Sequence, residues 1–180
     1  GITATDDMLG KRLWDRVRGH PSLDKVLVYE ATYLDNVFHI ILTPGLWAFH
    51  MLEAWTRGSV WTGTGKVLGD WEDLEPRNEY AHQITGAYYS ARLGVLEHMD
   101  SMRRSGACLI WRDIGPEYWA PVGVWLIRET VREAMKLTPR QFDSLKHAID
   151  YVAPRVSAPD DLRNNWFVKR SRQTRLDSFA

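Results

Sequence analysis

The chain has 180 residues, of which 44% are hydrophobic and 26% are charged, so it is long and apolar enough to form the core of one globular domain. Its 23 acidic and 23 basic side chains cancel, which argues against a protein that coats nucleic acid over its whole surface but allows a local basic face. Its one cysteine, Cys108, excludes an intrachain disulfide framework and a Cys-based zinc site.

The sequence carries no membrane or secretion signal. No apolar stretch approaches the length of a transmembrane helix, and the first residues lack the pattern of a signal peptide. We therefore expect a cytoplasmic protein without a membrane partner. Because the first residue is Gly1 and not Met, we also expect that the chain is the C-terminal part of a longer protein.

The first predicted element is a helix over residues 5–18. Thr5 or Asp6 can cap it, and its apolar residues recur at helical spacing. Its other face is basic and carries Lys11, Arg12, Arg16 and Arg18. These cations either neutralise DNA phosphates without sequence preference or form an ordinary solvated face.

A β-hairpin and a second helix are predicted next. Residues 25–34 and 37–42 are rich in β-forming side chains, and Asp35-Asn36 between them favours a two-residue turn. Thr43-Pro44-Gly45 ends the second strand. Residues 46–57 then read as an amphipathic helix, with Leu46, Phe49 and Trp55 facing inward.

The middle of the chain begins irregularly. Residues 58–77 contain four glycines and an acidic group over 70–75, with Asp70, Glu72, Asp73 and Glu75. These acids are either simply exposed or, if two carboxylates converge, bind Mg²⁺ as two-metal nucleases require. A long helix is predicted over 78–103, followed by a buried strand over 107–111.

Two further helices complete the predicted domain. One spans residues 124–136, and the other spans 138–152 with Thr138 as its cap and Pro139 in its first turn. The order of elements predicts an α+β fold in which a small mixed sheet with a hairpin is covered by four to five helices.

We interpret residues 1–152 as this globular domain. Residues 153–170 are predicted to be a linker with a small aromatic anchor at Trp166-Phe167, and 171–180 a flexible C-terminal peptide.

Several charged residues lie within apolar segments. Arg92 and Arg112 are the basic members, and buried charges must pair, so we expect Arg92 or Arg112 to meet Glu97, Asp113 or Glu117. The alternative is a pocket in which Arg92 and Arg112 hold a phosphate of a nucleotide or a DNA end.

The C-terminus reads Q-x-x-L-x-x-F, formed by Gln173, Leu176 and Phe179. One helical turn would place Leu176 and Phe179 on the same side, where they can dock into the groove of a partner. The spacing resembles the PIP box, the peptide that binds the replication sliding clamp. This resemblance implies that Gln173 enters a polar pocket and that the two apolar side chains fill an apolar one. Ala180 stands where the pattern usually has a second aromatic residue.

Two interpretations of the tail are open. The cations that precede the motif, Lys169, Arg170 and Arg172, either contact acids of the clamp and nearby DNA phosphates or are a solvated charge run. In the second interpretation the whole tail is a frayed polar end.

Three internal segments, 42–55, 86–97 and 112–125, resemble one known family. They include a Tyr-Tyr-x-Ala-Arg-Leu run and a Pro-Glu-Tyr-Trp run, and they are similar to the C-terminal half of the archaeal Nre DNA-repair proteins. The resemblance implies a role in DNA repair, with the sliding clamp (PCNA) and DNA as partners and a nucleoid-associated place in the cytoplasm. Longer family members carry a Cys-type zinc motif near their N-terminus. The chain has no residues for it, so we expect no metal and no other cofactor in this fragment.

The sequence thus favours a DNA-repair protein that reaches its site through a clamp-binding peptide. The alternative is a metal-dependent nuclease or nucleotide-handling enzyme with a pocket near Arg92, Arg112 and the acidic group over 70–75. A third interpretation is a scaffold whose only activity is protein binding. Whether the chain catalyses a reaction stays open.

Overall fold

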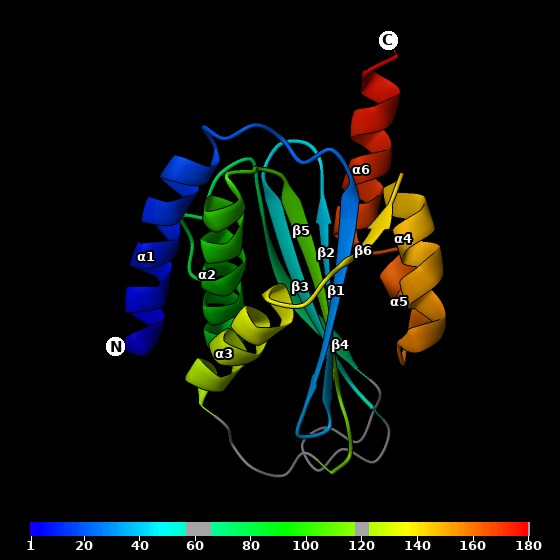
Figure 1. Cartoon of the computed structure of the whole chain (residues 1–180). Helices are drawn as coiled ribbons and strands as arrows, with labels where there is room; N and C mark the ends of the chain where they lie inside the picture. The colour runs from blue at the N-terminus through cyan, green and yellow to red at the C-terminus, as the bar shows by residue number, and fades with distance from the viewer. Residues whose placement is uncertain (57–65, 118–122, 180) are drawn as a thin grey trace.

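The computed structural model describes residues 1–56, 66–117 and 123–179, which form one mixed β-sheet with helices on both faces (Figure 1). The strands in these ranges are β1 (Val26–Tyr33), β2 (Asn36–Thr43), β3 (Ala48–Trp55), β4 (Val67–Asp73), β5 (Ala107–Ile114) and β6 (Arg140–Phe142). Across the sheet they follow the order β4-β3-β5-β2-β1-β6. The β3–β5 pair is parallel, and the other neighbouring pairs are antiparallel.

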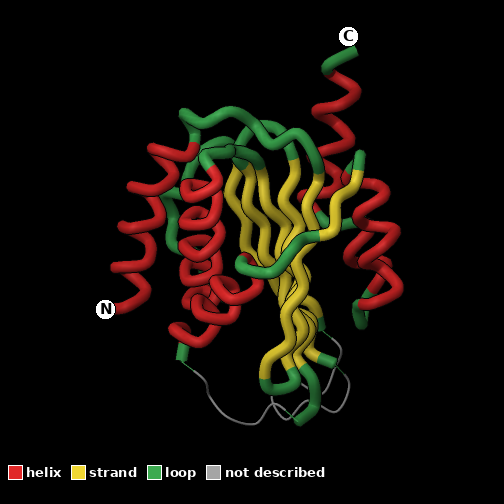
Figure 2. The backbone as a smooth tube through the Cα atoms, in the orientation of Figure 1, coloured by secondary structure: helices red, strands yellow, loops and turns green. Residues whose placement is uncertain are grey.

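The helices form a layer on each side of the sheet, as Figure 2 shows. On one side lie α1 (Ile2–Val17), α2 (Thr85–Met102) and α3 (Val124–Met135), and on the other lie α4 (Leu145–Val152), the short 3-10 helix η1 (Ala153–Arg155), α5 (Pro159–Arg163) and α6 (Trp166–Asp177). The predicted α+β fold is therefore confirmed. None of the helices in the described residues has the length and apolar character needed to cross a bilayer.

The sheet separates two hydrophobic cores. Successive side chains of a strand point to opposite faces, so Phe49 and Met51 of β3 pack in the core under α2 and Leu52 packs in the core under α4 and α6. Because both faces are covered by helices, the central strands are apolar on both sides. In β5, every residue from Ala107 to Ile114 is buried.

The predicted hairpin is present, with its turn one residue earlier than expected. Tyr33 pairs with Asn36, so the two turn residues are Leu34 and Asp35. Their φ angles are +42° and +60°, the left-handed values that a tight hairpin turn requires at both positions. The Asn36 side-chain amide donates to the Leu34 carbonyl at 2.9 Å and so stabilises this turn.

The expected helix over 46–57 is wrong, because residues 48–55 form strand β3. This strand is fully covered on both faces, so no exposed polar residue marks the alternation by which a strand is recognised. A dense apolar run of this kind fits helical spacing as well as it fits a buried strand. Leu46, expected to face inward, is 72% exposed.

The expected helix over 78–103 begins only at Thr85. The residues before it are held in an irregular conformation, because the Asp70 carboxylate accepts hydrogen bonds from the backbone N–H groups of Gln83 at 3.0 Å and Ile84 at 2.8 Å. A distant side chain therefore decides where this helix starts.

The expected helix over 138–152 is two elements, β6 and α4. Residues Arg140–Phe142 pair with the edge strand β1 instead of entering the helix. The cap is Ser144, whose hydroxyl oxygen accepts from the His147 N–H at 3.2 Å, and not Thr138.

The acidic group does not lie in a loop, since Val67–Asp73 is strand β4 and pairs with β3. Asp70 and Glu72 are buried on the side of α2, whereas Trp71 between them is 47% exposed. Residues 57–65, which belong to the expected irregular segment and the end of the expected helix, lie outside the described residues.

Residues 153–170, expected as a linker with an aromatic anchor at Trp166-Phe167, contain η1, α5 and the first turns of α6. Leu162, Phe167 and Val168 are buried in the second core, together with Ala148 and Ile149 of α4. This segment therefore covers one face of the sheet, and it positions the C-terminal residues that follow.

A close contact between α2 and α3 gives the first testable prediction. A Cβ added at Gly94 would lie 2.9 Å from Cγ1 and 3.3 Å from Cβ of Val131, which is buried and β-branched and so has little rotamer freedom. We expect Gly94→Ala to lower the free energy of unfolding in urea by about 1–3 kcal/mol, although Ala is the better helix former.

Gly19→Ala is the matched control, because its added Cβ would meet its nearest neighbour at 3.4 Å. It should change stability by less than about 0.5 kcal/mol. A Gly94→Ala variant as stable as the wild type would show that α2 and α3 do not pack this closely.

Candidate interaction site at the C-terminal helix

Helix α6 has a buried base and a free end. The Asn165 side chain caps it by accepting from the Val168 N–H at 3.1 Å, and Phe167 and Val168 are buried under it. The residues from 172 to 179 are all exposed. Figure 1 shows the end of α6 projecting past the end of the sheet.

The residues of the predicted clamp-binding motif all lie on this free end. Leu176 is 71% exposed and Phe179 is 82% exposed, and Gln173 is exposed as well. The Phe179 N–H donates to the Leu176 carbonyl at 3.1 Å, so a helical turn joins the two apolar side chains. Ala180 lies outside the described residues. Two large apolar side chains within one helical turn thus face solvent, and neither belongs to a hydrophobic core.

Arg170 and an aromatic cluster fasten the base of α6 to the sheet. The Arg170 Nε donates to Asp73 Oδ1 at 2.6 Å, and its Nη2 lies 3.5 Å from the Trp47 carbonyl oxygen. The Trp166 ring stacks on Trp71 at a centroid distance of 5.6 Å, and the His50 ring makes a T-shaped contact with each of them. The start of α6 is therefore held by β4 and by the segment that precedes β3.

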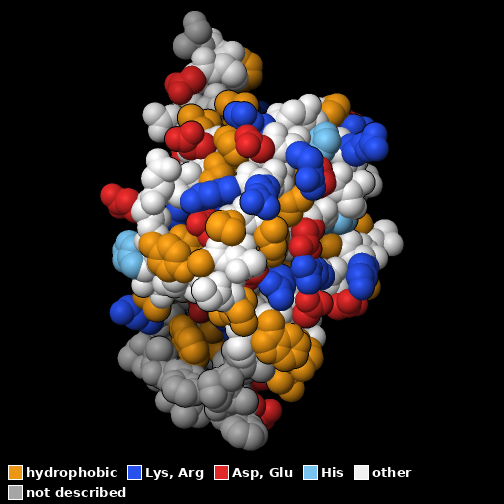
Figure 3. Space-filling view, turned by 90° about the vertical axis from the view of Figure 1, so that its left-hand side faces the viewer, with side chains coloured by type: hydrophobic (Ala, Val, Ile, Leu, Met, Phe, Trp, Pro, Cys, Tyr) orange, Lys and Arg blue, Asp and Glu red, His pale blue; other side chains and the backbone are white. Residues whose placement is uncertain are grey.

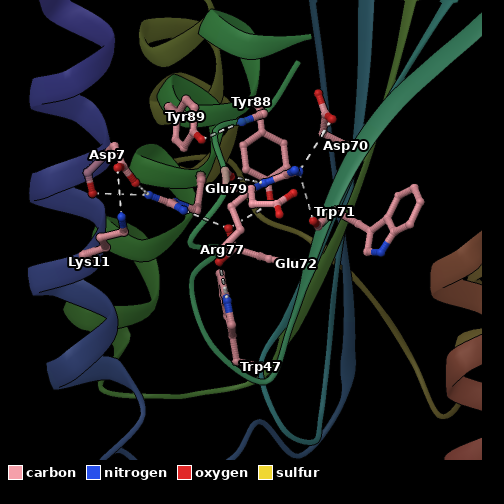
Figure 4. Close-up of polar contacts among 12 residues, drawn as sticks. Asp7, Lys11, Trp47, Asp70, Trp71, Glu72, Arg77, Glu79, Tyr88 and Tyr89 are labelled. Atoms are coloured by element: carbon pink, nitrogen blue, oxygen red, sulfur yellow. Dashed lines mark hydrogen bonds and ion pairs between the residues drawn. The ribbon is translucent and has the colours of Figure 1, made fainter. Parts of the chain in front are cut away.

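A buried polar network lies on the other face of β4, directly behind this contact (Figure 4). The Glu72 carboxylate accepts hydrogen bonds at 2.8 Å from three donors, Trp47 Nε1, the Tyr88 hydroxyl and Arg92 Nη1. Arg92 also donates to Asp7 Oδ1 of α1 at 2.5 Å. Figure 4 shows the Trp71 ring pointing away from this network, to the opposite face of the strand.

The network carries strongly perturbed groups. Burial raises the pKa of the Tyr88 hydroxyl well above its ordinary value, and the neighbouring Glu72 carboxylate raises it further. Burial alone would lower the pKa of Arg92, but its pairing with Glu72 and Asp7 raises it above its ordinary value. Arg92 therefore keeps its positive charge in the core, and its contact with Glu72 at 2.8 Å holds both side chains in place.

The two arginines of the predicted phosphate pocket each have protein partners already. Arg92 is fully buried and is occupied by Glu72 and Asp7. Arg112 of β5 donates from Nε to Asn36 Oδ1 at 2.8 Å and from Nη1 to Glu53 Oε1 at 3.0 Å. The structure pairs each with a different carboxylate from a different strand.

The expected partners of these arginines are wrong, although the arginines do form ion pairs, as expected of buried charges. Glu97 binds Arg132 instead, at 2.6 Å, and the Asp113 carboxylate accepts from the backbone N–H and hydroxyl of Ser157. The actual partner Glu53 is fully buried, and burial raises its pKa despite the nearby Arg112. Only the strand pairing of β3 with β5, which places Glu53 opposite Arg112, could have shown this.

Three of the four acids of the predicted magnesium site, Asp70, Glu72 and Asp73, bind protein donors. Asp70 accepts from two backbone N–H groups and lies 3.5 Å from Arg77 Nη1, and Glu72 accepts from the three donors of the buried network. Within residues 1–56, 66–117 and 123–179, no three His, Cys, Asp or Glu side chains are grouped so that they could hold a metal ion.

The predicted DNA-contacting cations divide into paired and unpaired ones. On α1, Lys11 pairs with Asp7 at 3.0 Å, Arg16 with Asp100 at 2.9 Å and Arg18 with Asp15 at 3.1 Å. Figure 3 views this side of the molecule, where blue and red side chains are interspersed.

The unpaired cations of the predicted set are Arg12 of α1 and Lys169 and Arg172 of α6. Their side chains form no ion pair or hydrogen bond with another described residue, whereas Arg170 pairs with Asp73. Two of these three unpaired cations therefore lie on α6. The sequence alone could have indicated that Lys11 is paired, because Asp7 lies four residues before it on the same helix.

Comparison with known proteins identifies related sequences. Family models described as "Archaeal Nre, C-terminal" and "Archaeal Nre, N-terminal" match residues 72–179 and 1–62. The chain is 35% identical, over 99% of its length, to proteins named "DNA repair protein NreA" from Archaeoglobus fulgidus and Haloferax volcanii, and it covers 44% of each. It is 33% identical to "DNA repair protein NreB" from Archaeoglobus fulgidus, again over 99% of its length and 46% of that protein. The chain thus spans less than half the length of these relatives, and no solved structure matches it significantly.

The two matched segments are interleaved in the sheet. Strands β1, β2 and β3 fall in the N-terminal match, and β5 and β6 fall in the C-terminal match. Because β5 lies between β3 and β2, each segment completes the sheet of the other. The similarity therefore reaches beyond the C-terminal half to which the sequence motifs pointed.

The buried network yields a stability prediction. Glu72→Gln keeps the size of the side chain but removes one of the two carboxylates that compensate the fully buried Arg92. We expect it to lower the free energy of unfolding by about 3 kcal/mol, because the only remaining carboxylate partner among the described residues, Asp7, is partly exposed and breaking a buried ion pair is costly. Chemical denaturation measures this, with Glu75→Gln as a control at an exposed carboxylate nearby. A loss below about 1 kcal/mol for Glu72→Gln would contradict the role of this ion pair.

The aromatic cluster at the base of α6 yields a pH prediction. Burial lowers the pKa of His50 to about 4, so the folded protein favours the neutral ring. The unfolded chain, in which an ordinary histidine has a pKa of about 6.5, binds the proton more readily. Stability from this group is therefore complete above about pH 6.5 and is lost as the pH falls toward 4.

Thermal unfolding of the wild type and of His50→Phe at several pH values between 7.5 and 4 measures this effect. The variant keeps an aromatic ring but cannot titrate, so its melting temperature should fall less than that of the wild type on acidification. Burial also lowers the pKa of His39 and His98, so only the difference between the two proteins reports on His50. Parallel curves would show that His50 does not couple folding to pH.

Proposed function

The chain belongs to the archaeal Nre family, and we propose that it takes part in DNA repair and reaches its site by binding the replication sliding clamp through Gln173, Leu176 and Phe179. The relatives named above as DNA repair proteins support the first part of this proposal. The second part rests on the free end of α6.

The observation that carries the clamp proposal is the exposure of Leu176 and Phe179. These two large apolar side chains belong to no core, so their burial by a partner would be favourable and would stabilise a complex. The helical turn between them presents both to one groove, while the exposed Gln173 one turn earlier can make polar contacts at its rim. Burial of two such anchors by a short segment fits an affinity on the order of micromolar.

Binding of the clamp would also bring the protein to DNA. A clamp on chromosomal DNA places its partners beside the nucleoid, and the unpaired Arg12, Lys169 and Arg172 are available for phosphates. The paired cations of α1 are less suited to bind phosphates, because each would first have to break its ion pair with a carboxylate.

A metal-dependent nuclease gains no support from the described residues. The acids that would have to bind Mg²⁺, Asp70 and Glu72, accept hydrogen bonds from protein donors and are buried beneath α2. We therefore propose recruitment, without a proposed reaction, as the function of this chain.

Calorimetric titration of the sliding clamp of the same organism tests the proposal. The double variant Leu176→Ala/Phe179→Ala removes both anchors, and we expect the affinity to fall at least about 100-fold, since each buried anchor is worth about 1.5–3 kcal/mol. The control Thr174→Ala/Ser178→Ala changes two exposed polar residues in the same segment and should bind within about threefold of the wild type. Equal binding of the anchor variant and the wild type would refute clamp recruitment through this motif.

A further inference from the structure

A groove runs between α4, α5 and α6 on the face of the sheet opposite α2. Its volume is about 690 Å³, and its lining includes the apolar side chains of Val26, Ile149 and Val168. A space of this size accommodates a ligand the size of one or two nucleotides. Gln173, Leu176 and Phe179, which are proposed to bind the clamp, do not line it.

The rim of this groove is cationic. Lys146 of α4, Arg163 of α5, and Arg172 and Arg175 of α6 line it, together with the carboxylates of Asp143 and Asp150. The lining therefore carries a net charge of +2 in a chain whose formal net charge is zero. Such a local excess attracts polyanions although the chain as a whole has no net charge.

The carboxylates in the lining do not neutralise the arginines of α6. Asp150 is shared by Lys146 at 2.7 Å and Arg163 at 2.6 Å, and Asp143 pairs with Lys25 outside the groove. The Arg172 and Arg175 guanidinium groups bind no partner among the described residues. Spaced three residues apart, they lie on the same side of α6 as the buried Val168.

We propose that this groove binds single-stranded DNA, with Arg172 and Arg175 on successive phosphates and the apolar floor under the sugars and bases between them. Guanidinium groups are the donors best suited to phosphate oxygens. An apolar floor beneath a cationic rim suits a strand whose bases are unstacked, because a duplex buries its bases and offers only phosphates. This places the DNA contact on α6 and α4, away from the paired cations of α1.

The proposal rests on the proposed function in one respect, the position of the groove beside the clamp-binding residues. Arg172 and Leu176 are four residues apart, about 6 Å along the axis of α6. A protein held on the clamp by Leu176 and Phe179 would therefore bring the groove within reach of a strand that leaves the clamp. The affinity of the groove itself needs no clamp.

Fluorescence anisotropy with a labelled 20-nucleotide oligothymidylate and the full chain tests the proposal. We expect Arg172→Gln/Arg175→Gln to weaken binding at least tenfold and to reduce the slope of log K against log salt by about 1.4, the value for two lost phosphate contacts on a single strand. Lys146→Gln/Arg163→Gln, on the opposite wall, should also weaken binding, and circular dichroism should show that both variants are folded.

The matched control is Arg16→Gln/Arg18→Gln, which removes the same charge from two paired cations of α1. It should bind within about twofold of the wild type with a nearly unchanged slope. An equal loss in this control would show that net charge and not the groove binds DNA, and it would overturn the proposal. Unchanged binding of the two groove variants, or tighter binding of a 20-base-pair duplex than of the single strand, would overturn it as well.

The clamp variant separates the two proposals. Leu176→Ala/Phe179→Ala should bind the oligonucleotide as the wild type does even where it fails to bind the clamp, and Lys146→Gln/Arg163→Gln should bind the clamp as the wild type does. If the wild type does not bind the clamp but the groove variants lose DNA, the groove stands and clamp recruitment falls. If the clamp is bound and no variant changes DNA affinity, the groove falls alone.

Discussion

The buried carboxylate of Glu72 is the constraint on which the arrangement of this domain depends. Removing one carboxylate and one guanidinium from water costs several kcal/mol for each ion, and the cost is offset only when all partners are in place. Those partners come from three places in the chain, Trp47 before β3, Tyr88 and Arg92 on α2, and, through Arg92, Asp7 on α1. The position of β4 at the sheet edge, the placement of both helices and the conformation before β3 therefore depend on one another. The end of β4 also fixes the position of α6, because Asp73, next to Glu72, accepts a hydrogen bond from Arg170 of that helix.

The order of the strands makes the two family segments one folding unit. The parallel pair β3–β5 joins strands from the two segments, and β1 lies between β2 of its own segment and β6 of the other. Strands that lie far apart in sequence must pair before either core is complete, and this raises the loop-closure entropy that folding has to overcome. Neither segment can keep both faces of its strands covered alone, so we expect the domain to unfold as a whole.

What the sequence predicted well was local. The hairpin, helix α1, the buried strand β5 and helix α3 follow from turn residues and periodicity within their own segments. What it missed was decided by partners elsewhere in the chain. Strand β3 is apolar on both faces because helices cover both, and helix α2 starts late because Asp70 occupies the N–H groups before it. Glu72 of β4 can be buried because Arg92 and Tyr88 donate hydrogen bonds to it. The partners of Arg112 follow from a strand register that periodicity does not contain.

The twelve residues of helix α6 include a base that packs against the sheet and a free end that we propose binds partners. The charged residues of the helix mark the boundary between these two parts. Arg170, near the base, forms an ion pair with Asp73 and so holds the helix against the sheet. The guanidinium groups of Arg172 and Arg175 pair with no other described residue. The apolar side chains of Leu176 and Phe179 are exposed to solvent. Exposed apolar surface and unpaired cations do nothing for the free energy of folding, so stability does not account for their presence. A helix that is already formed up to Asp177 lowers the ordering entropy that a partner must overcome, compared with a disordered peptide of the same sequence. The anchored base thus favours binding at the free end without contacting the partner itself.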